Sequence, residues 1–222
     1  MYTWFHSVSS LLLPVLAGLF RFTQDWGLAV IALTSLVKTG LFYFNLLAAR
    51  QQIRSIQAQP RLKELRERHG SDPEKLVAET MKVNREHGIS PLLPFGVLLA
   101  QMPVLAGMYG LFLTHGSMMT SILIPWVANL AEWDPYHLVP AVTALFSFLT
   151  ALVPLTAEAA APVPGGGANR TLMALLAGLI PLAFMWRSPA ALGLYWLTGT
   201  VFSLAERGFY RTGWGRRSLL RR

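Results

Sequence analysis

Long apolar runs separated by polar segments are the dominant pattern of this chain. Five such runs cover residues 28–47, 91–113, 136–155, 171–186 and 191–205, and a single charged side chain, Lys38, interrupts them. The first three runs are long enough for a helix to cross a hydrocarbon core of about 30 Å. The last two are shorter and are joined only by the residues RSPA, so we expect a tight helical hairpin in a locally thin bilayer. The pattern therefore predicts an all-α membrane protein with five transmembrane helices.

The segment before the first run predicts a further helix. Residues 4–22 favour an amphipathic, interfacial helix on the outer surface, interrupted near Pro14, with an additional span as the alternative. A cleavable signal peptide fits poorly, because the segment has no basic residue before its apolar stretch.

The long polar segment between the first two runs predicts a charged cytoplasmic helical hairpin. Gly70 and Gly88 are typical helix-ending residues, and Ser71 or Asp72 followed by Pro73 is typical of a helix start. The predicted divisions are an outer-surface helix (1–27), the first span (28–47), the hairpin (48–90), the second span (91–113), an outer loop (114–135), the third span (136–155), a cytoplasmic loop (156–170), the fourth span (171–187), the fifth span (188–206) and a basic cytoplasmic tail (207–222).

The distribution of positive charge predicts the orientation. The net charge is +8, and sixteen of the 19 Lys and Arg residues lie in residues 50–85, at Arg170 or from Arg207 onward. If the spans alternate, these regions share one compartment, and the positive-inside rule places the N-terminus outside and the C-terminus in the cytoplasm. The tail is interpreted as a topology anchor, with contact to anionic lipids or a ribosome as the alternative, and no specific nucleic acid binding is expected.

Lys38 is the most informative residue within the runs. A cation at the centre of a transmembrane helix costs roughly 2.5 to 3.5 kcal/mol on insertion scales unless it meets water or polar groups. The alternative is that the Lys38 side chain snorkels to the membrane interface. The end of the run at Leu47, however, lies about 13 Å further along the helix, beyond the reach of that side chain. Lys38 therefore predicts a wet or polar interior.

Other polar side chains in the runs favour the same interior. Thr34, Lys38 and Asn45 would form one stripe on a continuous helix, and Gln101 precedes Pro103 near the middle of the second span. Thr143, Ser147 and Thr150 would share a face of the third span. Ordinary interhelical hydrogen bonding is the alternative for the hydroxyls. No Asp or Glu falls within the five runs to neutralise Lys38.

Catalytic chemistry finds little support in the sequence. The chain has no phosphate-binding loop, no cysteine, and five histidines without metal-ligand spacing. Ser147 and His137 would lie about 15 Å apart on one helix, too far for a nucleophile and its base. We therefore expect a protein that is not an enzyme and that needs no cofactor or metal.

Several motifs together resemble the YidC family of membrane protein insertases, which is related to the Oxa and Albino insertases. They are DWGLAVIALTSLVKTGLFYF, the charged hairpin, HGISPLLPFGVLLAQMPVLAGMYGLF, DPYHLVP and SPAALGLYW, in that order. The resemblance covers about residues 4–211. The family usually has arginine where this chain has Lys38, and the chain resembles a short form without a large periplasmic domain.

The resemblance implies a membrane insertase and chaperone of the bacterial plasma (inner) membrane. A hydrophilic groove, open to the cytoplasm and lipid, would take up the short polar tail of a nascent membrane protein, attracted by Lys38. Tyr195 and Trp196 would contact the client, although anchoring in an aromatic belt is an equal alternative. The implied partners are nascent membrane proteins, and also ribosomes, targeting factors and the Sec translocon. A small transporter or channel subunit using Lys38 as an anion or proton site, and a structural assembly subunit, are the other hypotheses.

Overall fold

The computed structural model describes residues 3–69, 72–90, 92–155 and 167–220. Helix makes up 81% of the structure and the described residues contain no strand, so the all-α prediction is confirmed for them. The α-helices are α1 (Thr3–Thr23), α2 (Trp26–Gly40), α3 (Phe42–His69), α4 (Pro73–Glu86), α5 (Leu93–His115), α6 (Leu138–Leu152), α7 (Gly167–Met185), α8 (Ala190–Arg211) and α9 (Gly213–Leu220). A 3-10 turn, η1 (Gly116–Met118), follows α5. The predicted loop at 156–170 lies largely outside the described residues.

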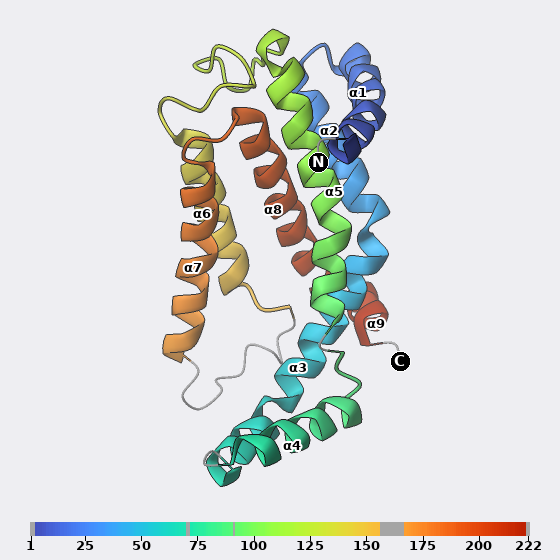
Figure 1. The fold of residues 1–222 in the computed structure, drawn as a ribbon, viewed down its shortest axis with the longest axis vertical. Coiled ribbons are helices and arrows are strands. Elements are labelled where there is room, and N and C mark those ends of the chain that lie inside the picture. The colour runs from blue at the N-terminus through green and yellow to red at the C-terminus, as the bar shows by residue number, and fades with distance from the viewer. Residues whose placement is uncertain (1–2, 70–71, 91, 156–166, 221–222) are drawn as a thin grey trace.

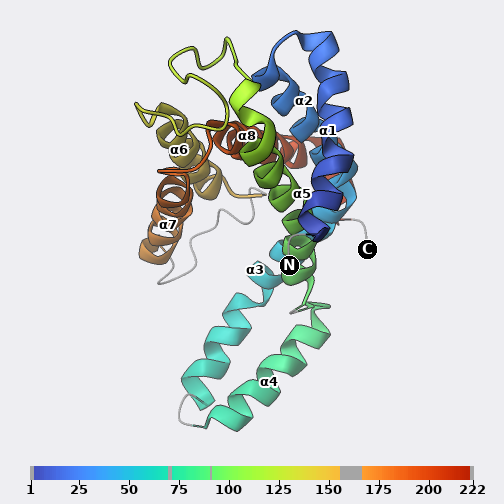
Figure 2. The same ribbon diagram turned by 45° about the horizontal axis from the view of Figure 1, so that its top comes forward.

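Helix α8 occupies the middle of the bundle. It packs against α2 on one side and α6 on the other, while α7 covers α6 and α1 lies against α5 and α2 (Figure 1). The loop that links α5 to α6 closes one end of the bundle, here called the loop end. The α3–α4 hairpin projects from the opposite end, here called the hairpin end (Figure 2).

The main hydrophobic core lies toward the loop end. It joins Leu16 of α1, Val30 and Leu33 of α2, and Phe112 of α5, all nearly inaccessible to solvent. Burial of each such side chain stabilises the fold by about 1.5 to 3 kcal/mol. Helix α1 is therefore part of the bundle, and it runs unbroken through Pro14. The interruption expected near Pro14 is wrong, because this packing outweighs the one backbone hydrogen bond that the proline removes.

The loop between α5 and α6 is also packed into this core, through Met119, Ile124, Val127 and Leu130. The sequence predicts an outer loop at residues 114–135, and the structure buries these four of its side chains against the helices.

Two carboxylates hold this loop in place. Asp25, the N-cap of α2, accepts hydrogen bonds from Leu28 N at 2.8 Å, Ile122 N at 2.7 Å and Ser121 Oγ at 2.9 Å. Asp134 accepts from Trp126 Nε1 at 2.9 Å and from Val139 N at 2.7 Å. Each carboxylate therefore accepts hydrogen bonds both from a backbone amide at the start of a helix and from donors in the loop.

The first predicted span is divided in two. Helix α2 ends at Gly40, α3 begins at Phe42, and their axes are bent by 62°. Among the described residues, no single helix is both long and apolar enough to cross a membrane, whereas this bent pair qualifies together by length and composition only. The number of spans and their orientation stay predictions.

The hairpin follows its local sequence signals. Asp72 caps α4 by accepting a hydrogen bond from Lys75 N at 3.2 Å, and Pro73 opens the helix. Beyond α4, Gly88 adopts a φ of +61°, a conformation that favours glycine. A small core of Ala58, Leu65 and Val83 joins α3 to α4.

Candidate functional site

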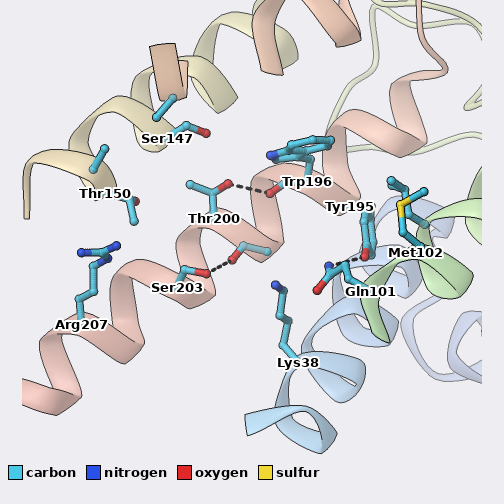
Figure 3. Close-up of a pocket in the computed structure, with 14 residues that line it drawn as sticks. Lys38, Gln101, Met102, Ser147, Thr150, Tyr195, Trp196, Thr200, Ser203 and Arg207 are labelled. Carbon is cyan, nitrogen blue, oxygen red and sulfur yellow. Dashed lines mark hydrogen bonds between the residues drawn. The ribbon is translucent and has the colours of Figure 1, made fainter. Parts of the chain in front are cut away.

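A cavity of about 590 Å³ opens beside α8, with α2, α5, α6 and α7 around it (Figure 3). Polar and apolar side chains are mixed in its wall. The lining residues are Lys38, Gln101, Met102, Leu105, Ser147, Thr150, Ala151, Ala177, Tyr195, Trp196, Gly199, Thr200, Ser203 and Arg207.

Lys38 enters this cavity across the backbone of α8. A Cβ atom placed on Gly199 would lie 3.2 Å from Lys38 Cε and 3.7 Å from Nζ, so the missing side chain of Gly199 makes room for the lysine stem. The Lys38 side chain is half-buried, and no hydrogen bond or close ion pair joins its ammonium to another residue of the described ranges. The ammonium is therefore available to an anionic group in the cavity.

Gln101 joins α5 to α8 next to this lysine. Its Nε2 donates a hydrogen bond to the Tyr195 hydroxyl at 2.8 Å, and Tyr195 is only 4% exposed. The Gln101 carbonyl oxygen points toward the Lys38 side of the cavity in Figure 3. Tyr195 is therefore a buried residue that links α8 to α5. Its neighbour Trp196 is half-buried and packs on Phe184, with ring centroids 5.8 Å apart.

The hydroxyl groups of the cavity mostly donate to their own helices. Thr150 donates to Phe146 O, Thr200 to Trp196 O and Ser203 to Gly199 O, at 2.7, 3.0 and 2.9 Å. Their oxygens remain acceptors for donors in the cavity.

Ser147 differs from these hydroxyls. Its Oγ is buried and has no hydrogen-bond partner among the described residues, and it lines the cavity. An unpaired buried hydroxyl is costly, so Ser147 is the hydroxyl of the cavity wall whose hydrogen-bonding capacity is left unused by the described residues.

Six of the nine predicted site residues line the cavity: Lys38, Gln101, Ser147, Thr150, Tyr195 and Trp196. The other three lie elsewhere. Thr34 is 1% exposed and donates to Val30 O, and Thr143 is fully buried and donates to Val139 O. Asn45 lies beyond the α2–α3 bend and donates to Glu206 Oε1 at 3.1 Å. The bend separates Asn45 from Lys38, whereas Thr34 lies on α2 with Lys38 but is packed in the core, so the expected stripe of three residues does not form one surface.

Two charged residues near the cavity were missed by the sequence analysis. Arg207 lines the cavity and donates through Nη1 to Val153 O at 2.6 Å. Glu206 is half-buried, and its charge acts electrostatically on Lys38. Both lie just past the last apolar run. The sequence held a signal for Arg207, because Trp196, Thr200, Ser203 and Arg207 recur at helical spacing and so share one face of the helix.

Metal ligation finds no geometric support in the part of the chain that the structure describes, because no cluster of three or more His, Asp or Glu side chains is placed to hold an ion.

The chain matches the sequence profile of the family described as 60Kd inner membrane protein over residues 13–214. It is similar to proteins named membrane protein insertase YidC. The identity is 27% over 208 residues with the protein of Coxiella burnetii strain RSA 331, covering 94% of this chain and 35% of that protein. It is 29% over 210 residues for Laribacter hongkongensis, covering 93% and 36%. For Histophilus somni strain 2336 it is 27% over 218 residues, covering 98% and 39%. The chain thus spans less than two fifths of the length of these relatives.

Proposed function

This chain belongs to the 60Kd inner membrane protein family, the family of the YidC insertases, and on that premise we propose that it inserts proteins into a membrane. The proposed clients are nascent membrane proteins with a short polar tail ahead of an apolar segment. The observation that carries the proposal is the cavity beside α8, where the Lys38 ammonium meets polar side chains from α5, α6 and α8.

The proposed topology is that of five spans formed by α2 with the start of α3, α5, α6, α7 and α8. The N-terminus is outside and the C-terminus in the cytoplasm of a bacterial inner membrane. The charge distribution supports this orientation, because the basic hairpin and the basic C-terminal residues then share the cytoplasmic side.

In the proposed mechanism the polar tail of the client enters the cavity from the hairpin end. Lys38 attracts its acidic groups, and Ser147 and Gln101 exchange hydrogen bonds with its polar groups. The apolar segment of the client moves along α6 and α8 into lipid. Transfer of roughly 20 apolar residues into the bilayer supplies the driving force, so no nucleotide is consumed at this site.

The distribution of apolar residues favours this function over a channel or transporter. Beyond Lys38 toward the loop end, the interior is filled by side chains such as Ala29, Val30, Leu33 and Met108. A conducting path needs polar groups throughout its length. The described interior instead supports a cavity that is closed at the loop end. Ribosomes, targeting factors, the Sec translocon and anionic lipids remain proposed partners.

The test is insertion by the purified full chain in proteoliposomes, together with complementation of insertase-depleted cells. Lys38→Arg is expected to retain insertion. Lys38→Ala is expected to lower insertion of clients with acidic tails roughly fivefold, the effect of about 1 kcal/mol of lost attraction. Arg187→Ala removes one positive charge from an exposed site outside the cavity and serves as the matched control. Full activity of Lys38→Ala on acidic tails would refute the electrostatic role.

A further inference from the structure

Glu206 is a half-buried carboxylate at the hairpin end of α8. Asn45 Nδ2 donates a hydrogen bond to its Oε1 at 3.1 Å and so fixes the carboxylate against α3. No cation among the described residues forms a close ion pair with Glu206, so this neutral amide is the side chain that holds it.

The α2–α3 segment and helix α8 run side by side, and equal steps along the two segments bring successive pairs of residues together. Lys38 lies across Gly199, and Asn45 contacts Glu206, seven positions further along each chain segment. Seven residues of helix rise about 10 Å. The backbone of Glu206 therefore lies about that distance beyond Gly199 toward the hairpin end, and the charges of Glu206 and Lys38 interact.

Arg207 occupies the same depth on a different side of α8. Neighbouring helix residues point about 100° apart. Arg207 accordingly lines the cavity next to Thr150 (Figure 3) and donates a hydrogen bond to Val153 O at the end of α6. Glu206 faces α3, where Asn45 bonds to it. Adjacent positions of α8 thus carry a positive charge in the cavity wall and a negative charge on the side that faces α3, both nearer the hairpin end than Lys38.

We infer that Glu206 determines which client tails this site accepts, by opposing the attraction of Lys38 for acidic residues and admitting tails that contain a basic residue. The inference rests on the proposed function. Without the carboxylate, the positive charge of Lys38 would favour acidic tails and repel basic ones. With it, the path has a smaller net positive charge and tolerates both signs.

The experiment uses three clients that differ at one position of a short translocated tail, which holds Glu, Gln or Lys. Protease protection measures their insertion by the full chain in proteoliposomes. Glu206→Gln keeps an oxygen that accepts from Asn45 but removes the charge. The ratio of Lys-tail to Glu-tail insertion is expected to fall about three- to tenfold in this variant. Glu86→Gln removes one exposed carboxylate from the hairpin and should leave the ratio unchanged.

Glu206→Asp separates charge from structure, because it keeps the carboxylate and should retain the wild-type ratio. An unchanged ratio in Glu206→Gln overturns the inference while leaving the proposed function intact. Equal losses for all three tails, shared by Glu206→Gln and Glu206→Asp, also overturn it, because they mark a structural role. A wild-type chain that inserts none of the three tails overturns the proposed function and this inference together.

Discussion

The side-chain amide of Gln101 on α5 donates a hydrogen bond to the hydroxyl of Tyr195 on α8, at 2.8 Å. This bond joins two helices that contact each other at few other places along the cavity, and it lies beside Lys38. The two residues are 94 positions apart in the sequence.

Tyr195→Phe should therefore destabilise the protein. It removes the acceptor and leaves a part-buried amide donor unpaired, which costs about 1 to 3 kcal/mol. The measurement is thermal unfolding in detergent. Tyr109→Phe on α5 removes a hydroxyl from a side chain that is 41% exposed and should have little effect. Equal melting temperatures for wild type and Tyr195→Phe would show that the bond does not contribute.

The packing of α8 on α6 depends on Gly193. A Cβ atom at this position would lie 2.7 Å from Val139 Cγ1, and the branched valine has little freedom to move away. Gly193→Ala should therefore destabilise the fold by about 1 to 3 kcal/mol.

Gly208→Ala on the same helix is the matched control. Nothing lies within 4 Å of a Cβ atom there, so the gain in helix propensity should stabilise the protein by about 0.5 to 1 kcal/mol. Chemical denaturation of both variants tests the opposite signs, and a stabilised Gly193→Ala would contradict the predicted clash.

The docking of α9 depends on Gly215. A Cβ atom there would lie 2.0 Å from the backbone oxygen of Phe209, which cannot rotate away as a side chain would. Gly215→Ala should displace α9 from the end of α8, even though Arg50 Nη2 on α3 still offers its hydrogen bond to Ser218 O.

Limited trypsin digestion measures this displacement, because Arg216 and Arg217 lie within α9. Cleavage should be faster in Gly215→Ala, whereas Gly213→Ala, with nothing within 4 Å of its Cβ, should resemble wild type. Equal cleavage rates in the two variants would rule out the tight approach at Gly215.

Asp25 makes the loop end sensitive to acid. Burial alone would raise the pKa of Asp25, but the hydrogen bonds from Leu28, Ile122 and Ser121 outweigh it and hold the pKa below its ordinary value of 3.8. The group is thus more acidic in the folded state than in the unfolded chain. Its contribution is fully present above about pH 4 and is lost as the pH falls through the lowered pKa.

Asp25→Asn should remove this part of the pH dependence. It should cost about 1 to 3 kcal/mol at neutral pH, because a neutral amide accepts the three donors less well. Melting temperatures from pH 3 to 7 should converge for the two proteins at the acid end. A constant difference across the range would show that the charge of Asp25 is not involved.

Short-range signals in the sequence predicted structure well. Each helix-end signal in the hairpin depends only on neighbouring residues. Examples are the cap at Asp72 with the proline after it, and the positive φ of Gly88 beyond the other end of α4. The apolar runs likewise placed helical segments, because hydropathy records which residues avoid water.

Long-range packing could not be predicted in the same way. Residues 42–47 are as apolar as the run before them, so hydropathy does not mark the bend at Leu41. Thr34 and Ser147 are both small hydroxyl residues in apolar runs. Thr34 bonds within a packed core, whereas Ser147 lines the cavity and its Oγ has no hydrogen-bond partner in the part of the chain that the structure describes. Glu206 was overlooked because it follows the last apolar run. Its hydrogen-bond partner Asn45 lies 161 positions away in the sequence, so no local pattern connects the two residues.

The bend at Leu41 also changes the electrostatics around Lys38. It ends α2 only a few residues beyond the lysine, which therefore lies in the last turn of a helix, inside the bundle. The C-terminus of a helix has the effect of about half a negative charge, arising from the aligned peptide dipoles. Part of the stabilisation of the Lys38 cation thus comes from backbone that neither titrates nor needs to be displaced. An anionic group can approach the ammonium while this stabilisation persists, and a straight helix through the same residues would not provide it.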